Sequence, residues 1–222
     1  MRLNLDAGEL DDEPADLIPL ADMVNVACGA HAGSEALARG AMRRAKAHGV
    51  AVGAHPGYPD RANFGRRPMA LTLAELRDSI AAQLRWLDAI ARDEGASLAH
   101  VKPHGALYHG TTEAHAVATC VMEATREVLG QVELVGFPFG ALDIFATVGR
   151  WPFAREGFAD RGYRDDGALV PRGEPGDVIE SLDAVRAQVR RLAREGVVST
   201  VCVHGDGERA LEVARAVREV LG

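Results

Sequence analysis

The chain has 222 residues, and its 25 Lys and Arg against 32 Asp and Glu give a formal charge of −7. This acidic balance argues against a nucleic-acid backbone or an anionic membrane as the main partner. No apolar run approaches the ~20 residues of a transmembrane helix, and the acidic N-terminal segment lacks the apolar core of a signal peptide. Three widely spaced cysteines predict no disulfide framework. We expect a cytoplasmic protein with a single domain over residues 1–222.

Short apolar runs alternate along the chain with longer segments of helical periodicity, which predicts repeated βα units. Strands are expected at residues 3–6, 23–27, 50–55, 98–102, 132–136 and 200–204, with a weaker one near 153–157. Helices are expected at residues 34–48, 72–94, 112–129, 182–195 and 208–221. Thr72 and Glu75 have the spacing of a capping box, and Gly49, Gly130 and Gly196 stand where helix-ending glycines belong.

The strand residues favour a barrel over an open sheet. Neither the G-x-G-x-x-G nor the P-loop pattern of an open nucleotide-binding sheet occurs. Strands buried on both faces are almost continuously apolar, but here apolar and polar residues alternate, as in Leu3 and Leu5 against Asn4 and Asp6. The sequence therefore predicts an irregular (β/α) barrel with helices outside and a polar pocket at one mouth.

Polar residues follow the predicted strands at their carboxyl ends, where (β/α) barrels place their active sites. Four histidines stand beside glycine or alanine at successive strand ends: His31, His55, His104 and His204. A lone histidine there is usually structural, but four together predict a functional pocket. The residues expected to converge on one mouth are Asp6, Asn25, His55, Lys102, His104 and His204.

Several of these polar residues allow a structural interpretation beside the functional one. Arg66 and Arg67 either clamp a carboxylate or phosphate or pair with surface acids. Lys102 either forms a Schiff base or, as we favour, stabilises a developing oxyanion. Asp160 and Arg161 either bind substrate or form a buried structural ion pair. From sequence alone, Lys102→Met is expected to reduce turnover far more than stability, which should change by only about 1–2 kcal/mol.

Eight sequence blocks, beginning at the first predicted strand and ending at the last, resemble the LamB/YcsF family. They read LNLDAGE (3–9), NVACGAHAG (25–33), GAHPGYPD (53–60), FGRR (64–67), HVKPHGALY (100–108), FADRGY (158–163), LVPRG (169–173) and VHGD (203–206). The resemblance implies a seven-stranded irregular parallel (β/α) barrel, similar to the glycoside hydrolase/deacetylase fold. The loop LDDEPADLIP (10–19) and the stretch near 196–201 are shorter than the family pattern, which affects the rim of the pocket.

The resemblance also implies a reaction, namely ATP-coupled opening of the 5-oxoproline lactam to glutamate. The partners would be 5-oxoprolinase subunits B and C, and the co-substrate ATP, with Mg²⁺, without a tightly bound organic cofactor. Without a Walker sequence, ATP binds either an unfamiliar pocket of this chain or a partner subunit. Catalytic roles are expected for Asp6, His55, Lys102 and His104. Substrate-binding roles are expected for Glu9, Asn25, His31, Arg66, Arg67, Asp160, Arg161, His204 and Asp206.

Two other functions fit the same residues. A metal-dependent deacetylase or amidohydrolase would use Asp6 and two of the histidines as ligands and would activate water directly. A non-catalytic subunit would bind the lactam and deliver it to its partners. Metal analysis of the purified protein distinguishes the first alternative, since a stoichiometric transition metal favours it over the oxoprolinase reaction. Unchanged turnover of the assembled complex after substitution of Lys102 or His104 by alanine would favour the non-catalytic subunit.

Overall fold

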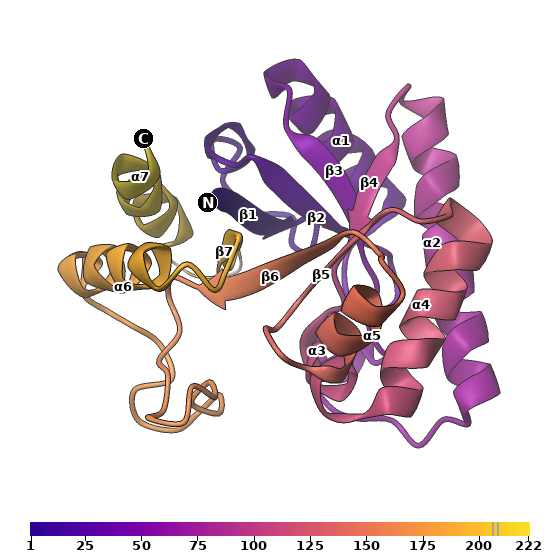
Figure 1. The fold of residues 1–222 in the computed structure, drawn as a ribbon. Helices are drawn as coiled ribbons and strands as arrows, with labels where there is room; N and C mark the ends of the chain where they lie inside the picture. The colour runs from indigo at the N-terminus through magenta and orange to yellow at the C-terminus, as the bar shows by residue number, and fades with distance from the viewer. Residues whose placement is uncertain (206, 208) are drawn as a thin grey trace.

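A computed structural model describes residues 1–205, 207 and 209–222 of the chain. Seven parallel strands form a closed barrel in the order β1-β2-β3-β4-β5-β6-β7, with β7 pairing back onto β1 (Figure 1). This confirms the predicted fold class. The strands are β1 (Arg2–Ala7), β2 (Met23–Ala27), β3 (Ala51–His55), β4 (Leu98–Val101), β5 (Glu133–Gly136), β6 (Phe153–Phe158) and β7 (Thr200–Val203).

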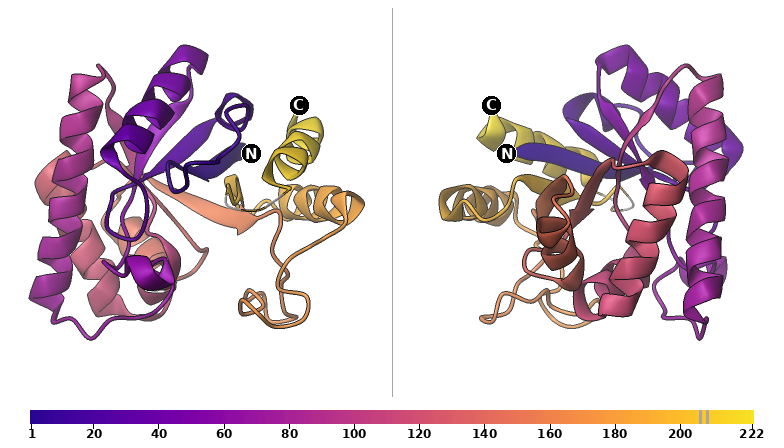
Figure 2. Two further views of the ribbon diagram at one scale, coloured as in Figure 1. Left: turned by 180° about the vertical axis from the view of Figure 1, so that it is seen from behind. Right: turned by 45° about the vertical axis from the view of Figure 1, so that its right-hand side comes forward.

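Helices follow the strands and cover the outside of the barrel, as the views in Figures 1 and 2 show. They are α1 (Glu35–His48), α2 (Leu73–Asp93), α3 (Gly105–Glu113), α4 (His115–Leu129), α5 (Ala141–Val148), α6 (Leu182–Glu195) and α7 (Ala210–Leu221). Two 3₁₀ turns, η1 (Ile18–Leu20) and η2 (Arg61–Asn63), lie in the connections after β1 and β3. The two termini lie near each other in every view (Figure 2).

Local signals account for most helix ends. Thr72 and Glu75 form the predicted capping box at the start of α2, and Gly49 and Gly196 end α1 and α6 in the left-handed conformation. The helix expected at 112–129 is two helices instead, because the extended backbone of Ala114 separates α3 from α4. Helix α5 was not expected from the sequence, since eight residues are too few to show a clear period.

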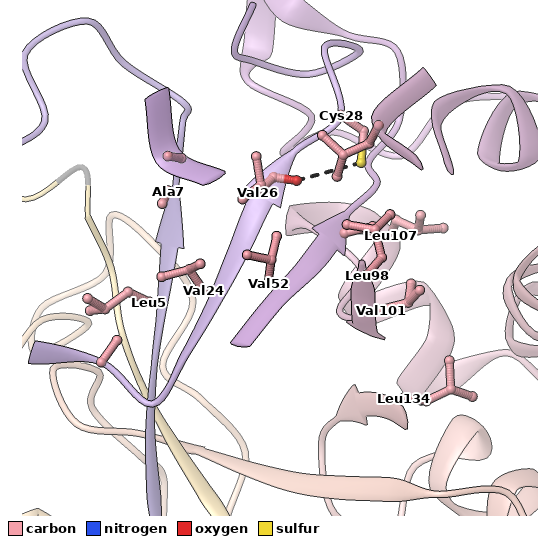
Figure 3. Packing of buried hydrophobic residues seen from close by; sticks show 14 of the residues in the cluster. Leu5, Ala7, Val24, Val26, Cys28, Val52, Leu98, Val101, Leu107 and Leu134 are labelled. Atoms are coloured by element: carbon pink, nitrogen blue, oxygen red, sulfur yellow. Dashed lines mark hydrogen bonds between the residues drawn. The ribbon is translucent and has the colours of Figure 1, made fainter. Parts of the chain in front are cut away.

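The outward faces of the strands carry the apolar residues that pack against the helices. Figure 3 shows Leu5, Val24 and Val52 side by side on β1, β2 and β3, within a cluster that continues to Leu98 and Val101 on β4. The inward faces are partly polar, as the alternation predicts. The amino-terminal end of the interior is apolar, where Met23, Val135 and Ala154 form a small separate cluster.

Gly53 on β3 and His100 on β4 are partners in register, and the glycine makes room for the imidazole inside the barrel. A Cβ atom at Gly53 would overlap the His100 ring. The ring is held on its other side, where Nε2 donates a hydrogen bond of 2.8 Å to Asn25 Oδ1. The cysteines Cys28, Cys120 and Cys202 are buried and unpaired, as expected. Among the described residues, no helix has the length and apolar character needed to cross a bilayer.

Replacing Gly53 by alanine should lower the free energy of unfolding by about 1–3 kcal/mol, because the added methyl group displaces the His100 ring from a packed interior. Chemical denaturation of the variant measures this loss. Gly40→Ala is the control, since Gly40 lies within α1 with space beside it and alanine there should stabilise by up to about 1 kcal/mol. Equal stability of Gly53→Ala and the parent would contradict the close packing.

Candidate active site

A cavity of about 600 Å³ opens at the carboxyl end of the barrel strands, where the sequence predicts the site. Its base carries the side chains of Asp6, Glu9, His55, Lys102 and His104. Helix α3 forms one wall, and the segment between β6 and α6, which extends away from the barrel in Figure 1, forms another. Arginines line this outer part: Arg66, Arg161, Arg164 and Arg172.

Lys102 lies at the centre of the base, between two carboxylates. Its Nζ is 2.9 Å from Asp6 Oδ1 and 3.0 Å from Glu156 Oε1, and Cys202 Sγ is also 3.0 Å away. Burial alone would raise the pKa of Asp6, but electrostatic interactions with His55 and Lys102 outweigh burial and hold that pKa well below its usual value. Burial likewise opposes the charge on Lys102, but Asp6 and Glu156 raise its pKa overall. The ammonium ion therefore persists at neutral pH, which disfavours the Schiff-base alternative.

A second row of amides and an imidazole holds these charges in place. Asn25 Nδ2 donates to Asp6 Oδ1 at 2.8 Å and to Asn4 Oδ1 at 2.8 Å, while its own carbonyl oxygen accepts from His100. Asn4 in turn donates to Thr200 Oγ1 at 2.9 Å. Every one of these side chains is buried. Asn25 thus orients Asp6 and does not line the cavity.

Glu156 is the functional residue that the sequence analysis does not single out. It is fully buried on β6, and among the described residues no well-aligned hydrogen bond reaches either of its carboxylate oxygens. The Lys102 ammonium at 3.0 Å is the charge that balances it. The signal in the sequence is the period-two spacing of Ala154, Glu156 and Phe158. This spacing puts all three side chains on the same face of β6, which is the face inside the barrel.

Four side chains meet beside this ion-pair cluster: Glu9, His31, His55 and His104. His55 Nε2 and His104 Nδ1 are 3.0 Å apart, and Glu9 Oε1 lies 3.3 Å from His104 Nδ1 and 3.2 Å from His31 Nε2. The rings of His31 and His104 are stacked, with centroids 3.9 Å apart. Burial, and then the electrostatic interaction with His55, lower the pKa of His31 to about 3 and that of His104 well below its usual value.

The backbone positions this histidine–glutamate group. Gly8 adopts a positive φ of 70°, and the Glu13 carboxylate accepts from the backbone N–H groups of Gly8 and Glu9 at 2.7 Å each. The loop after β1 therefore fixes the backbone of Glu9. Phe64 has a φ of 55°, which a side chain makes unfavourable, and its carbonyl oxygen accepts from His104 Nε2 at 2.8 Å. Such strain is common where a backbone group serves a functional site.

At the rim, the predicted pairing of Asp160 with Arg161 does not form. Asp160 instead pairs with His204, whose Nδ1 is 3.0 Å from Asp160 Oδ2, and this charge lowers the pKa of Asp160 despite its burial. Arg161 donates to the backbone carbonyls of Val170 and Asp177 at 2.6 and 2.9 Å. Because all three residues lie in the segment between β6 and α6, Arg161 holds this outer wall together.

Most of the predicted site residues come together, but some do not reach the cavity. Asp6, Glu9, His55, Arg66, Lys102, His104, Arg161 and His204 line it. Asn25, His31 and Asp160 lie one layer behind and contact lining residues. Arg67 is exposed and is not part of the lining. Asp206 lies outside the described residues.

A closed seven-stranded parallel barrel with an acid–base cavity at the carboxyl ends of its strands places the chain among the (β/α)-barrel proteins with a polar site at that end. The chain belongs to the LamB/YcsF family, whose model matches residues 1–222.

Relatives and a solved structure agree with this family. A protein of Pyrococcus horikoshii, named as the A subunit of 5-oxoprolinase, is 41% identical over 99% of this chain and 92% of its own length. The protein of that name from Pyrococcus abyssi is 40% identical over the same shares. The crystal structure of a lactam utilization protein from Thermus thermophilus superposes with a TM-score of 0.91 at 37% identity, covering 100% of this chain and 95% of that one.

The two carboxylates beside Lys102 require a larger effect of Lys102→Met on stability than the sequence alone predicts. Removing the ammonium strands Asp6 and Glu156 in the interior, so the variant should lose about 3–5 kcal/mol of unfolding free energy. Adding Glu156→Gln should recover part of the loss, because one stranded charge is then neutral. Chemical denaturation of both variants measures this, and a loss within about 1–2 kcal/mol for Lys102→Met would contradict it.

The buried neutral histidines predict a loss of stability in mild acid. Burial lowers the pKa of His100 from 6.5 to about 3, so the unfolded chain binds a proton below pH 6.5 that the folded chain does not bind until about pH 3. Stability from this group is complete above pH 6.5 and falls as the pH drops, by about 2 kcal/mol between pH 7 and pH 5.

His31, with a pKa of about 3, adds a loss of the same sign. Urea unfolding at the two pH values measures the sum, and His115→Gln, a change at an exposed histidine, should keep the same difference. Equal stability at pH 7 and pH 5 would show that these histidines titrate normally.

Proposed function

We propose that the chain is the A subunit of a 5-oxoprolinase, which opens 5-oxo-L-proline to L-glutamate while ATP is hydrolysed to ADP and phosphate. The observation that carries the proposal is the convergence of Asp6, Lys102, His55 and His104 at the base of one cavity. The names of the Pyrococcus and Thermus relatives supply the substrate class. Subunits B and C are the proposed partners.

The chemistry explains why ATP is needed. A five-membered lactam is an unreactive amide, and transfer of the γ-phosphoryl group to its oxygen, with loss of the ring N–H proton and release of ADP, activates the carbonyl carbon. Water then adds to that carbon, the C–N bond breaks, and the nitrogen takes up a proton. A second water releases phosphate from the acyl phosphate to leave glutamate. These steps require positive charge near the oxygen, a base for water and an acid for nitrogen.

The residues at the base match these requirements. Lys102 keeps its ammonium charge between Asp6 and Glu156 and provides the positive charge near the lactam oxygen. His104 is neutral because burial lowers its pKa, and its Nε2 donates to the Phe64 carbonyl oxygen, so Nδ1 is the nitrogen on which the proposal relies to accept a proton from water. His55 Nε2, at 3.0 Å from that nitrogen and 3.5 Å from Asp6 Oδ2, can pass the proton on to the leaving nitrogen.

The rim matches an anionic substrate. The carboxylate of 5-oxoproline and the phosphates of ATP both need cations, and Arg66, Arg164 and Arg172 stand on the outer wall of the cavity. A small acid entering the pocket would meet these arginines with its carboxylate while its ring reaches the histidines. In this proposal ATP, with Mg²⁺, approaches from the same open side, where a partner subunit can complete its site.

Glutamate release from 5-oxoproline and ATP tests the function, using the full chain together with the two candidate partner subunits. His104→Gln should lower turnover by about a hundredfold or more, because the glutamine lacks a basic nitrogen. His115→Gln on the exposed surface should leave turnover unchanged.

Near-normal turnover of the His104→Gln assembly would contradict a catalytic role and would favour the non-catalytic lactam-binding subunit. Glutamate release by the two partners without this chain would contradict the proposal as a whole.

A further inference from the structure

His55 and His104 each use one ring nitrogen as a donor to the backbone. His55 Nδ1 is 2.7 Å from the carbonyl oxygen of Lys102, and His104 Nε2 is 2.8 Å from that of Phe64. A carbonyl oxygen only accepts, so both of these nitrogens carry hydrogen. When both rings are neutral, the remaining nitrogens, His55 Nε2 and His104 Nδ1, present lone pairs to each other at 3.0 Å. Two lone pairs at that distance require a positive ion or a proton between them.

The carboxylate of Glu9 places a third potential ligand atom beside these two nitrogens. Its Oε1 lies 3.3 Å from His104 Nδ1 and 3.9 Å from His55 Nε2. A tetrahedral ion bound at about 2.0–2.1 Å separates its ligand atoms by about 3.3 Å, so the observed spacing of 3.0 to 3.9 Å suits one ion with little movement. His31 Nε2, at 3.2 Å from Glu9 Oε1, donates to that carboxylate and orients it.

The surroundings have two properties of a built metal site. First, histidine ligands in proteins usually donate their other N–H to a carbonyl or carboxylate, which fixes the tautomer, and both histidines here do so. Second, the carboxylates of Asp6, Glu9 and Glu156 are all buried at this end of the barrel, and carboxylate groups near a site favour a bound cation.

We propose that Glu9, His55 and His104 bind one divalent transition-metal ion of the Zn²⁺ class. Imidazole nitrogen with a carboxylate oxygen is a donor set that suits such ions. All three residues line the cavity, so the ion keeps coordination positions open to it, as in sites that act on a substrate or water. The ligand set differs from the one expected from sequence, because Glu9 takes the place of Asp6, whose Oδ1 is engaged with Lys102.

A second group of donors nearby is a poorer site. Asp6, Cys202 and His204 also come within ligand distance of one another. The Lys102 ammonium, however, lies 2.9 Å from Asp6 Oδ1 and 3.0 Å from Cys202 Sγ, and it repels a second cation there. His204 is in addition paired with Asp160. The two groups can be separated by substitution.

The test is metal binding by the full chain without substrate, so that its failure is independent of the lactam reaction. After removal of bound metal with a chelator, calorimetric titration with Zn²⁺ should show one ion per chain, and Co²⁺ should produce the visible absorption of a low-coordinate site. His55→Gln, His104→Gln and Glu9→Gln should each weaken Zn²⁺ binding by about a hundredfold or more. At positions 55 and 104, glutamine keeps an amide N–H group that can donate to the backbone carbonyl oxygen. At all three positions, glutamine is a poor ligand for these ions.

His204→Gln is the matched control and should bind Zn²⁺ as the parent does. If only His204→Gln weakens binding, the ion belongs to the second group and the proposal is wrong. If binding is far below one ion per chain, or is the same in all variants, a shared proton joins His55 to His104 and the proposal is also wrong. Should a ligand variant fail to fold, as seen by circular dichroism, the parent still decides, because one bound Zn²⁺ must raise its melting temperature.

Discussion

The ammonium group of Lys102, enclosed by a barrel and balanced by two carboxylates, is the interaction on which the site depends. It joins β1, the end of β4 and β6, whose residues Asp6, Lys102 and Glu156 are far apart in sequence. Burying three charges costs desolvation free energy, and the attraction between them offsets that cost only with good geometry and further hydrogen bonds. Asn25 and Asn4 supply such bonds. The interior of this barrel is therefore organised around charge, while its stability comes from the apolar layer between strands and helices.

That organisation gives the cavity two chemically different ends. The base combines buried carboxylates, one ammonium and neutral histidines, whereas the outer wall carries arginines. This arrangement supports the proposed small anionic substrate, with its charge at the arginines and its uncharged part at the base. The wall itself is held together by Arg161, which donates to two backbone carbonyls within the segment between β6 and α6. The outer wall thus depends on the position of that guanidinium.

The proposed reaction and the proposed ion draw on the same two ring nitrogens, so a nitrogen that binds the ion does not accept a proton at the same time. Donation from His55 and His104 to backbone carbonyls fixes which ring nitrogen faces the cavity. Both roles need an oriented lone pair, and this donation provides it. Glu13, through its bonds to the backbone of Gly8 and Glu9, brings the carboxylate to the same point. The loop after β1 therefore has a direct structural role in the site.

The sequence by itself determined the strands, most of the helices and the side of the barrel on which the chemistry lies. Period-two alternation decides which side chains face inward, and caps such as Thr72 and Glu75 set helix ends, because both are local properties. Tertiary structure decided the rest. The pairing of β7 with β1 closes the barrel, and strand register then sets which inward groups meet. The period-two pattern of β6 places Glu156 inside the barrel but does not show that it meets Lys102. Arg67 belongs to a motif but remains exposed, and residue type does not reveal the two carbonyls that orient His55 and His104. Distances between such groups depend on contacts across the whole chain, and no local pattern encodes them.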